Sequence, residues 1–599
     1  MREYAVAATF DLAPSATLLD AVHANAHATP DHACFERKVG DEWEPVTARA
    51  FEREMTRLAA GLAAAGIAAG DRVGLLSRNR YEWAWCDYAL WAAGAVSVPI
   101  YVTSSPEQVA HMLRDAGAVA VIVETAEQVA TVEQLRAGLP ALAAIWAIED
   151  GALTRLAAAG DGAGSAEVRR REASLSGDST ATVIYTSGTT GRPRGCELTH
   201  RNLLFDATSA TTGLAEVFTA SSSTLLFLPL AHVFARVVQV ACVVTGARLG
   251  HSPDIRDLTG DLESFRPTFL LAVPRVFEKI YDAAQERARA ESKVKGRIFE
   301  RAAAVAVAYS RGLDQGGLGT ALRAQHAVFR RLVYRRLLRA LGGEVRYAVS
   351  GGAPLSVRLG HFFRGAGVTV LEGYGLTETS AGATLNRPVA CRIGTVGPPM
   401  IGTAVRIADD GEVLVRGPHV FRGYWGDPEG TAEVLDPAGW LITGDLGELD
   451  EDGFLTITGR KKEILVTAGG KNVAPAGLED RLRAHPLVSS AMVVGDARPY
   501  IATLLTLDPA AFAAWKAEHG KPAAAGPGDL REDPELQAAL AGVLESANAG
   551  VSHAEAVKRF RILDGDFTEA GGELTPKLGI RRSVIAKQYA ADIEALYAS

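Results

Sequence analysis

The residues with the clearest chemical meaning form a short loop rich in hydroxyl groups and glycine. An apolar, strand-like stretch, ATVIY (181–185), runs into this loop, whose residues are Thr186, Ser187, Gly188, Thr189, Thr190 and Gly191. Glycines let backbone N–H groups approach phosphate oxygens, and the hydroxyl groups add further donors. The GxxxxGK[ST] spacing of a Walker A loop is absent. Alone, the loop is most simply a flexible turn, but its composition suits a polyphosphate.

Five further polar motifs follow in order along the chain: LPLAHVFAR, SGGAPL, EGYGLTET, GWLITGD and GRKKEILVTAGGKN. Each has an ordinary explanation by itself, with Glu378 as a solvated loop acid, Asp445 as a turn former and His232 as a core histidine. Six ordered matches are a stronger signal. Together they resemble the motifs of the adenylate-forming superfamily, which contains acyl-CoA synthetases, luciferases and the adenylation domains of peptide synthetases. The resemblance spans roughly residues 20–590.

The resemblance implies a site for phosphate and magnesium. Thr377 and Glu378 would serve the phosphate and the metal, and Thr189 would be a second metal contact. A carboxylate beside a triphosphate suits Mg²⁺, which prefers oxygen ligands. The expected ligands are therefore Mg²⁺ with ATP or an acyl-AMP.

The resemblance also implies a nucleoside site. Tyr374 would stack on adenine, and Asp445 would hydrogen-bond both ribose hydroxyls with Arg460 as its basic companion. His232 would lie where the nucleotide meets the acyl group. The other implied nucleotide-binding positions are Gly351, Gly352, Ala353, Pro354, Glu372, Gly373 and Gly375.

Members of this superfamily alternate between two arrangements of a small C-terminal domain. By resemblance, residues 1–459 form the N-terminal domain, 460–463 the hinge and 464–599 the alternating domain, with Lys462 as the hinge residue. After the swing, Gly469 and Gly470 would contact the pantetheine arm of coenzyme A, because a thiol tunnel requires backbone without side chains.

The substrate is expected to be a hydrophobic carboxylic acid or its adenylate. The segments around Val233, Phe234 and Val273 are weakly aromatic, which favours an apolar acyl group over an amino acid. The ending LTPKLGIRR (574–582) resembles the long-chain fatty-acid branch. A bulky polycyclic acid remains an alternative.

Two positions depart from the superfamily pattern, and both concern cations that handle phosphate. Arg194 stands where the family usually has lysine, which replaces a compact ammonium with a planar fork. Gly579 stands where the long-chain branch has its catalytic lysine. Lys577 lies two residues earlier, on the same side if the segment is extended but about 6.6 Å away.

These departures lead to two main hypotheses. In the first, thioester formation is intact and adenylation is weak or lost, so that a separate adenylating enzyme supplies the adenylate. In the second, the protein is a complete ATP-dependent long-chain acyl-CoA synthetase that uses Lys577. An acyl-AMP ligase for a carrier protein and a nucleotide-binding pseudoenzyme are minor alternatives.

The elements that must position these residues alternate in type. From residue 71, short apolar runs flank a helix-length segment, and GAVAVIVE, TLLFLPL and VTVLEGYG continue this rhythm, which is typical of βαβ units. The charged segment 286–312 is predicted to be helical. We expect an α/β fold, with a large N-terminal domain of layered α/β subdomains plus a β-rich part, and a small mobile α+β C-terminal domain.

The composition of the chain limits its domain organisation and its possible binding partners. The chain has 599 residues, 48% of them hydrophobic, which is enough for several subdomains. A formal net charge of −8 argues against a nucleic-acid partner, and five scattered cysteines without CxxC spacing argue against a zinc site or disulfides. The sequence predicts a cytoplasmic protein with no integral membrane contact and no basic amphipathic stretch for binding a membrane surface.

Overall fold

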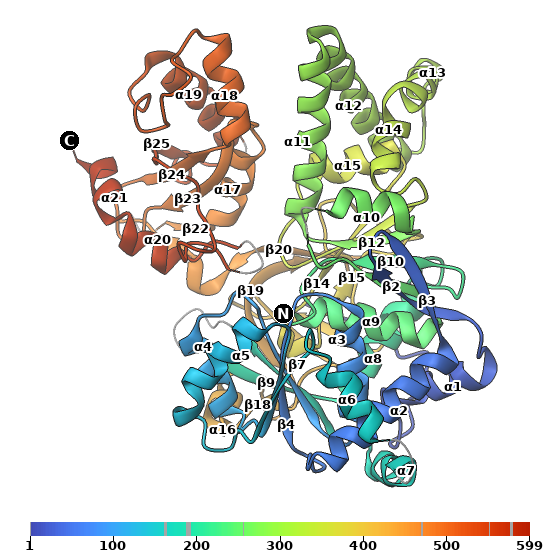
Figure 1. The fold of residues 1–599 in the computed structure, drawn as a ribbon. Coiled ribbons are helices and arrows are strands. Elements are labelled where there is room, and N and C mark those ends of the chain that lie inside the picture. Colours follow the sequence, from blue (N-terminus) through green and yellow to red (C-terminus); the bar gives the residue numbers. More distant parts are fainter. Residues whose placement is uncertain are drawn as a thin grey trace.

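The structure, a computed structural model, describes residues 2–160, 164–186, 193–254, 257–468, 471–549, 551–575 and 579–598. They form the predicted α/β fold, with mixed sheets and a separate C-terminal region (Figure 1). Within these ranges, no sheet joins a strand that precedes Lys461 to one that follows it. Each helix in the same ranges is too short or too polar to span a lipid bilayer.

A seven-stranded sheet forms the base of the N-terminal region. In spatial order its strands are β18 (Gly423–Tyr424), β9 (Arg194–Thr199), β8 (Thr180–Thr186), β5 (Val96–Ile100), β4 (Arg72–Leu76), β6 (Ala120–Val123) and β7 (Ala144–Ala147). The strands from β8 to β7 are parallel, and β6 is a wholly buried apolar run, as expected for a sheet covered by helices on both faces. Ligands of such sheets bind beyond the carboxyl ends of the strands.

Most helices associated with this sheet and its neighbour come from the first 245 residues. They are α1 (Asp20–Ala28), α2 (Ala48–Ala64), α3 (Tyr81–Ala92), α4 (Pro106–Asp115), α5 (Ala126–Leu135), α6 (Ala152–Ala159), α7 (Gly164–Ser174), α8 (His200–Gly213) and α9 (Val233–Thr245).

A buried ion pair joins two of these helices. Arg236 of α9 donates to both carboxylate oxygens of Asp87 of α3, with Nε–Oδ2 at 3.0 Å and Nη2–Oδ1 at 2.6 Å. Its remaining donors reach Thr182 Oγ1 at 2.7 Å and Ser97 Oγ at 2.9 Å. The Arg236 and Asp87 side chains are 1% and 0% exposed, so this buried network joins the central sheet to both helices.

Two four-stranded sheets lie beside the first. One contains β10 (Ser223–Leu226), β11 (Arg248–His251), β2 (Ala33–Val39) and β3 (Glu42–Thr47). The other contains β12 (Phe269–Ala272), β13 (Tyr347–Ser350), β14 (Thr369–Tyr374) and β15 (Thr384–Leu385). The parallel strands β13 and β14 are important for the site, because the glycine-rich motifs follow or end them.

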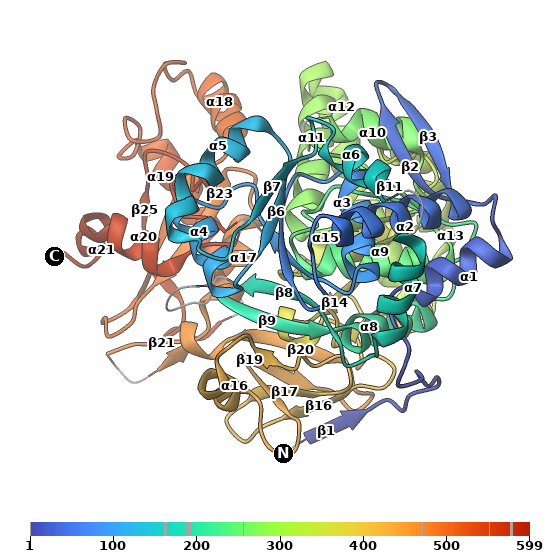
Figure 2. The ribbon, with the colours of Figure 1, turned by 60° about the horizontal axis from the view of Figure 1, so that its bottom comes forward.

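A five-stranded antiparallel sheet precedes the C-terminal region. Its strands in order are β1 (Arg2–Ala5), β16 (Ala404–Ile407), β17 (Glu412–Arg416), β19 (Leu441–Leu449) and β20 (Leu455–Arg460). Figure 2 shows β1 at the outer edge of this sheet, and Arg406 forms an ion pair with Glu3 at 2.6 Å. The first residues of the chain therefore complete a sheet built 400 residues later.

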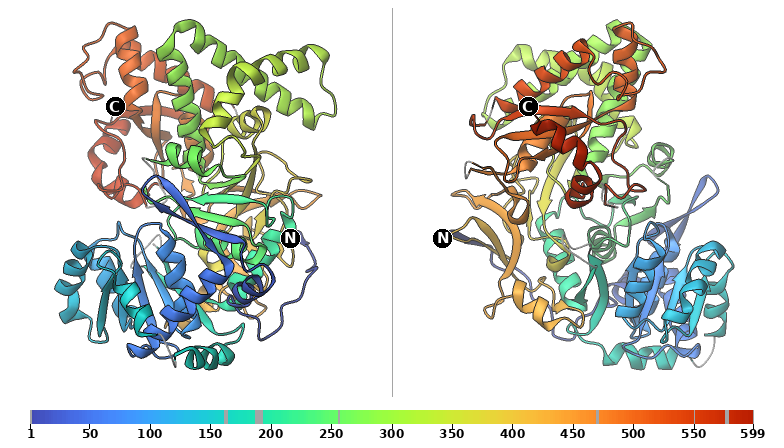
Figure 3. Two further views of the ribbon diagram at one scale, coloured as in Figure 1. Left: turned by 45° about the vertical axis from the view of Figure 1, so that its right-hand side comes forward. Right: turned by 90° about the vertical axis from the view of Figure 1, so that its left-hand side faces the viewer.

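A helical lobe projects from the sheets (Figures 1 and 3). Its helices are α10 (Leu258–Phe265), α11 (Pro274–Glu291), α12 (Lys293–Asp314), α13 (Thr320–Phe329), the π-helical turn η2 (Arg330–Tyr334), α14 (Arg335–Ala340) and α15 (Val357–Ala366). Ser292 divides the predicted helical segment 286–312, because its backbone is extended and its hydroxyl accepts a hydrogen bond from the N–H of Lys295.

The expectation that no basic amphipathic stretch exists is wrong. From α13 to α14, Tyr334 and Leu337 are buried in the lobe, while the arginines of the same segment are exposed. The sequence pattern is obscured because η2 inserts a π-helical turn, which shifts the helical period.

The C-terminal region has its own core. Its elements are η4 (Lys461–Glu463), β21 (Leu465–Val466), β22 (Asn472–Val473), α17 (Pro475–Arg483), β23 (Val488–Val494), β24 (Ile501–Leu507), α18 (Pro509–Glu518), α19 (Pro534–Asn548), β25 (Val557–Ile562), α20 (Arg582–Gln588) and α21 (Ala590–Tyr597). It touches the lobe through Arg275 of α11, which donates to Ser489 Oγ at 3.3 Å, and through Arg483, which lies 3.8 Å from Glu278.

Candidate functional site

The hairpin of β8 and β9 holds both ends of the hydroxyl-rich loop. Thr186, the last residue of β8, pairs with Arg194, the first residue of β9. The carboxyl end of β8 points to the edge of the parallel sheet at which ligands bind. The loop residues Ser187, Gly188, Thr189, Thr190 and Gly191 lie outside the described residues.

Arg194 is directed toward a cluster that the sequence did not reveal. Its guanidinium carbon lies 5.2 Å from the ring centroid of Tyr424, and its Nε lies 3.6 Å from Oδ2 of Asp427. Asp427 also caps α16 (Pro428–Val434) by accepting from the N–H of Gly430 at 2.8 Å. The Arg194 side chain is 46% exposed, so the guanidinium keeps donors available to a ligand.

Tyr424 links Arg194 to Glu378. Its hydroxyl donates to Glu378 Oε1 at 2.9 Å, and Glu378 lies in the short 3₁₀ turn η3 (Thr377–Thr379). The next residues, Ser380 and Ala381, have φ angles of 55° and 113°, a strained conformation for non-glycine residues that often marks functional sites. Glu378 and Arg194 are thus neighbours through an aromatic residue whose role no sequence spacing indicated.

The surroundings of Glu378 fit a magnesium ion that arrives with a triphosphate. The described residues contain no cluster of three acidic, histidine or cysteine side chains that could hold a metal unaided. Magnesium usually keeps several waters and is held by one or two carboxylates together with substrate phosphates. A single carboxylate with one oxygen engaged by Tyr424 is compatible with that arrangement.

Asp445, Arg460 and Tyr374 meet at the junction of two sheets. Asp445 of β19 and Arg460 of β20 are paired in register, and Arg460 Nε lies 3.1 Å from Asp445 Oδ1. The Tyr374 hydroxyl donates to Asp445 Oδ2 at 2.7 Å. Burial raises the pKa of the Asp445 carboxyl, and the charge of Arg460 opposes this shift. The structure therefore brings three sequence-predicted residues together around one carboxylate.

Asp445→Asn should weaken the binding of AMP or an acyl-AMP analogue by about 1.5–3 kcal/mol, the usual contribution of hydrogen bonds to a charged group. Asparagine removes the negative charge but keeps an acceptor for Tyr374. Isothermal titration calorimetry measures the change. The matched control is Glu448→Gln, at an exposed position of the same strand. Equal affinities of the Asp445 variant and the natural protein would remove Asp445 from the nucleotide site.

Two glycine motifs lie side by side after β13 and at the end of β14. A Cβ atom at Gly351 would lie 3.3 Å from the carbonyl oxygen of Gly373 and 3.6 Å from the ring of Phe234. At Gly375 it would lie 1.9 Å from the carbonyl oxygen of Ala381, so no side chain fits there. Val233 and Phe234 begin α9 and Val273 follows β12. Gly352, with a φ of 82°, leads into the exposed residues Ala353 and Pro354.

Glu372 is a buried carboxyl next to these glycines. Its backbone carbonyl accepts a hydrogen bond from the N–H of Asn386 at 2.9 Å, and the residue is 9% exposed. Burial raises the pKa of Glu372 to about 8. The sequence placed Glu372 in a nucleotide motif but gave no sign of this burial, which depends on the packing of β14 between its neighbours.

Glu372→Gln should alter how stability depends on pH. Because the folded pKa lies above the unfolded pKa, the natural protein loses stability as pH rises from about 4.5 to about 8, by up to about 1.4 kcal/mol per pH unit. Glutamine cannot ionise, so the difference in melting temperature in favour of the variant should grow over this window. Glu42→Gln, at the exposed end of β3, is the control. A constant difference across the window would contradict the assignment.

His232 lies at the start of α9, and its loop is held by Asn79. The Nδ1 atom of His232 accepts from the N–H of Phe234 at 3.1 Å. The Asn79 side chain donates to the carbonyl of Leu228 at 2.5 Å and accepts from the N–H of Leu230 at 2.9 Å. Asn79 therefore fixes the strand-to-helix loop that carries His232. Sequence reasoning missed Asn79, because its partners are about 150 residues away.

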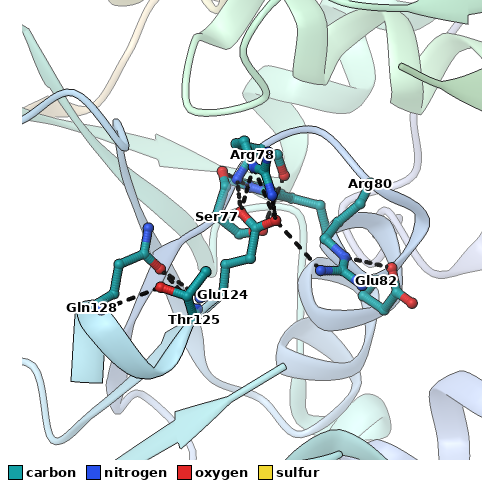
Figure 4. A network of polar contacts seen from close by, with 8 residues as sticks. Ser77, Arg78, Arg80, Glu82, Glu124, Thr125 and Gln128 are labelled. Atoms are coloured by element: carbon teal, nitrogen blue, oxygen red, sulfur yellow. Dashed lines mark hydrogen bonds and ion pairs between the residues drawn. The ribbon is translucent and has the colours of Figure 1, made fainter. Parts of the chain in front are cut away.

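The residues on either side of Asn79 are fixed by the buried carboxylate of Glu124 (Figure 4). Arg78 reaches Glu124 Oε1 through Nη2 at 2.8 Å, and its backbone N–H donates to Oε2 at 2.8 Å. Arg80 contacts Glu124 at 3.5 Å and donates to Glu82 at 2.8 Å. The turn after β4 is thus a rigid support for the His232 loop.

The described ends of the C-terminal motif, Thr575 and Gly579, lie close together. The N–H of Thr575 donates to the carbonyl of Gly579 at 2.8 Å, and the N–H of Gly579 donates to Thr575 Oγ1 at 3.1 Å. Leu574 and Ile580 form an adjacent antiparallel bridge. Lys577 lies outside the described residues, so its distance from Gly579 stays a prediction.

The hinge candidate Lys462 is exposed in the 3₁₀ turn η4. Its neighbour Lys461 is anchored to the five-stranded sheet, with Nζ at 2.7 Å from Asp410 and 2.8 Å from Glu412. The first residue of η4 is therefore still attached to the five-stranded sheet, and the described hydrogen bonds with this sheet end at Lys461. Gly469 and Gly470 lie outside the described residues.

Family models and full-length relatives match both the N-terminal and the C-terminal part of the chain. Residues 22–425 match the family described as AMP-binding enzyme, and residues 462–599 match the AMP-binding enzyme C-terminal domain. The long-chain fatty-acid–CoA ligase FadD15 of Mycobacterium tuberculosis is 49% identical, with all of both chains covered. The long-chain fatty-acid–CoA ligase ACSBG2 of Xenopus laevis is 30% identical over 95% of this chain and 82% of its own.

Solved structures share the fold at lower identity. The anthranilate CoA ligase AuaEII in complex with anthranoyl-AMP has a TM-score of 0.72 at 21% identity and covers 98% of this chain and 99% of its own. The adenylation domain of a carboxylate reductase from Mycobacterium chelonae has a TM-score of 0.74 at 22% identity, covering 98% of this chain and 92% of its own.

Proposed function

Because the chain belongs to the AMP-binding enzyme family, we propose that it is an AMP-forming acyl-CoA ligase that joins a long-chain fatty acid to coenzyme A through an acyl-adenylate. The substrate class is supported by full-length relatives that are named long-chain fatty-acid–CoA ligases. The main structural support for this activity is the position of the Asp445 carboxylate, which lies between Arg460 and Tyr374 beside the two glycine motifs. ATP or acyl-AMP, coenzyme A and Mg²⁺ are the usual ligands of such enzymes.

The residues of the nucleotide site have separate tasks in this proposal. Asp445 hydrogen-bonds the ribose hydroxyls, Tyr374 stacks on adenine, and the backbone from Gly351 to Pro354 packs against the base. The hydroxyl-rich loop from Thr186 and the guanidinium of Arg194 bind phosphate oxygens. Glu378 and Thr377 lie on the phosphate side, where Mg²⁺ would supply charge neutralisation when it accompanies the nucleotide.

The acyl group would enter between α9 and the glycine motifs. Val233 is buried, and the Phe234 ring lies 3.6 Å from where a Gly351 side chain would begin. Val273 continues this apolar wall after β12. His232 stands at the same helix start, positioned by Asn79, where it can contact the reacting carboxyl group.

The proposed domains are residues 1–459 and 464–599, with a hinge at 460–463. The anchored Lys461 and the exposed Lys462 support this boundary. Contacts that alternation would break are those of Arg275 with Ser489 and of Arg483 with Glu278. A location in the cytoplasm remains part of the proposal.

Lys462→Pro should impair one half-reaction far more than the other. Proline fixes φ and restricts the preceding residue, so a swing about this position would be trapped in one arrangement. Separate assays of adenylation and thioester formation measure the effect, and Lys462→Ala, which keeps backbone freedom, is the control. Equal losses in both half-reactions, or none, would place the hinge elsewhere.

Within this function, we propose that adenylation is the weak half-reaction. Gly579 provides no side-chain donor at the place of the expected lysine, and Arg194 replaces a second lysine. Such an enzyme would depend on a separate adenylating enzyme for its acyl-AMP. The second candidate is a complete ligase that uses Lys577. It is supported by the contacts between Thr575 and Gly579, which bring the described ends of this motif close together, so that a lysine between them need not be displaced by the full length of an extended segment.

The function is tested by supplying a long-chain fatty acid, ATP, Mg²⁺ and coenzyme A, and by supplying the acyl-AMP with coenzyme A alone. Acyl-CoA from the second mixture supports the ligase assignment, and its absence from both mixtures would overturn it. Comparable rates in both mixtures would favour the second candidate over weak adenylation.

A further inference from the structure

We propose that Glu412 is a positioning residue that holds the ribose-binding turn, residues 443–445, and Lys461 at the start of the hinge in one rigid unit. This role rests on the proposed function, because it gives Asp445 a link to the hinge. The motifs of the sequence and their spacing do not indicate Glu412, since its partners are 32 and 49 residues away.

The two carboxylate oxygens of Glu412, the first residue of β17, hold different parts of the chain. Oε1 accepts a hydrogen bond at 2.9 Å from the N–H of Gly444, which directly precedes Asp445. Oε2 accepts a hydrogen bond at 2.8 Å from Nζ of Lys461, the first residue of η4. The Glu412 side chain is 9% exposed, so the carboxylate is largely shielded from solvent. One carboxylate thus connects the ribose-binding turn with the start of the hinge.

The ribose-binding turn depends on this side chain because it lies in a β-bulge. Leu414 of β17 is opposite Ile442 of β19, but two residues earlier Glu412 is opposite Leu446. The residues of the turn therefore have no partner in β17. Gly444 has a φ angle of 74°, a conformation that favours glycine, and its N–H cannot join the ladder. The Glu412 carboxylate takes the place of the missing backbone acceptor.

The other end of the hinge turn is attached to the C-terminal region. Glu463 accepts a hydrogen bond from Nε of Arg582 at 3.3 Å, and Nη1 of Arg582 donates to the carbonyl of Val493 in β23 at 3.2 Å. Lys462 lies between the two attached residues and has no hydrogen bond or ion pair with another side chain in the described part of the chain. Glu412 therefore fixes the last residue of the N-terminal side, and rotation is left to Lys462.

A nucleotide that binds at Asp445 should consequently act on the hinge as well. When the ribose hydroxyls engage Asp445, the ribose-binding turn loses freedom, and the N–H of Gly444 stays against Glu412. Glu412 in turn stays against Lys461. The Lys461 side chain is 47% exposed, and an ion pair at such a position is weak by itself, so it responds to this support. Nucleotide binding thus tightens the fixed end of the hinge.

The test is limited digestion of the full-length protein by trypsin, with and without saturating AMP, in which mass spectrometry follows the cut after Lys461. AMP should slow this cut about three- to fivefold in the natural protein, the fold-change that corresponds to one partly exposed ion pair. In Glu412→Gln, the amide oxygen still accepts from Gly444, but the charge that holds Lys461 is gone. Calorimetry should show AMP affinity within about twofold of the natural value, because this hydrogen bond remains. The protection of Lys461 by AMP should nevertheless be lost.

The matched control is Asp410→Asn, because Asp410 also contacts Lys461, at 2.7 Å, but does not contact Gly444. A second control, Val413→Ala, removes buried methyl groups from the same strand and shows the effect of a weaker sheet alone. Both controls should keep the protection by AMP, and thermal unfolding checks that each variant is folded.

Three results would overturn the role of Glu412: undiminished protection in Glu412→Gln, loss of protection in all three variants, or AMP binding to the natural protein without protection of Lys461. Absence of AMP binding to the natural protein would instead overturn the proposed function, and with it this role.

Discussion

A Gly579→Lys variant should form pyrophosphate from ATP and a long-chain fatty acid about 10²–10³ times faster than the natural protein, the effect of one preorganised donor at a developing oxyanion. In adenylation, a carboxylate attacks the α-phosphate and negative charge moves onto phosphoryl oxygens and pyrophosphate. An ammonium group offsets that charge. Among the described residues, a Cβ atom at position 579 would meet only Thr575 Oγ1, at 3.3 Å, a tight contact that a small rotation of this hydroxyl relieves.

The rate of thioester formation from supplied acyl-AMP should change little in this variant, because in the proposed alternation that step uses a different face of the C-terminal domain. Arg194→Lys in the same background should add a smaller gain. Lys577→Ala in the natural protein separates the two candidate functions. Fast pyrophosphate release that disappears in Lys577→Ala would assign the catalytic cation to Lys577 and exclude weak adenylation.

Arg236→Met should destabilise the N-terminal region by about 3–5 kcal/mol, because it leaves the buried carboxylate of Asp87 without its partner. Five hydrogen bonds from the guanidinium end on Asp87, Thr182 and Ser97, so the substitution leaves all three buried side chains without these donors. Denaturant unfolding followed by tryptophan fluorescence is suited to the measurement. Trp83 and Trp91 flank the guanidinium at 5.6 and 5.7 Å.

A double variant, Arg236→Met with Asp87→Leu, is the control for this effect. Replacing both charges by apolar groups of similar size is often neutral, so the double variant should recover most of the lost stability. Burial already raises the pKa of Asp87, and in the single variant the opposing charge of Arg236 is gone. The destabilisation should therefore shrink at acidic pH. A double variant no more stable than the single one would show that packing, and not charge, is responsible.

Local patterns in the sequence predicted those parts of the molecule that depend on neighbouring residues. The strand before the hydroxyl-rich loop is β8, and the α/β rhythm from residue 71 is the parallel sheet. Asp445 and Arg460 are only 15 residues apart and meet because β19 and β20 are successive antiparallel strands.

Contacts that depend on sheet order were beyond the sequence. Tyr424 reaches Glu378 because β18 pairs with β9 at the sheet edge, which no periodicity encodes. In the sequence, Asn79 resembles an ordinary turn residue. Its role depends on hydrogen bonds with the backbone of Leu228 and Leu230, which only the folded chain places beside it. The basic helices after residue 320 were missed for a different reason, since a π-helical turn interrupts the period by which amphipathic helices are recognised.

The pairing of β1 with β16 also has a consequence for synthesis of the protein. Glu3 and Arg406 are separated by 403 residues, yet they are neighbours in one sheet. At roughly 5–20 residues per second, the ribosome needs about 20–80 seconds to deliver that partner. During this time the first strand has no place in the fold. The five-stranded sheet that contains Asp445 is therefore completed only after β16 has been synthesised. An extension fused before residue 2 would disturb the pairing of β1 with β16, and not the parallel sheet, whose strands are translated earlier.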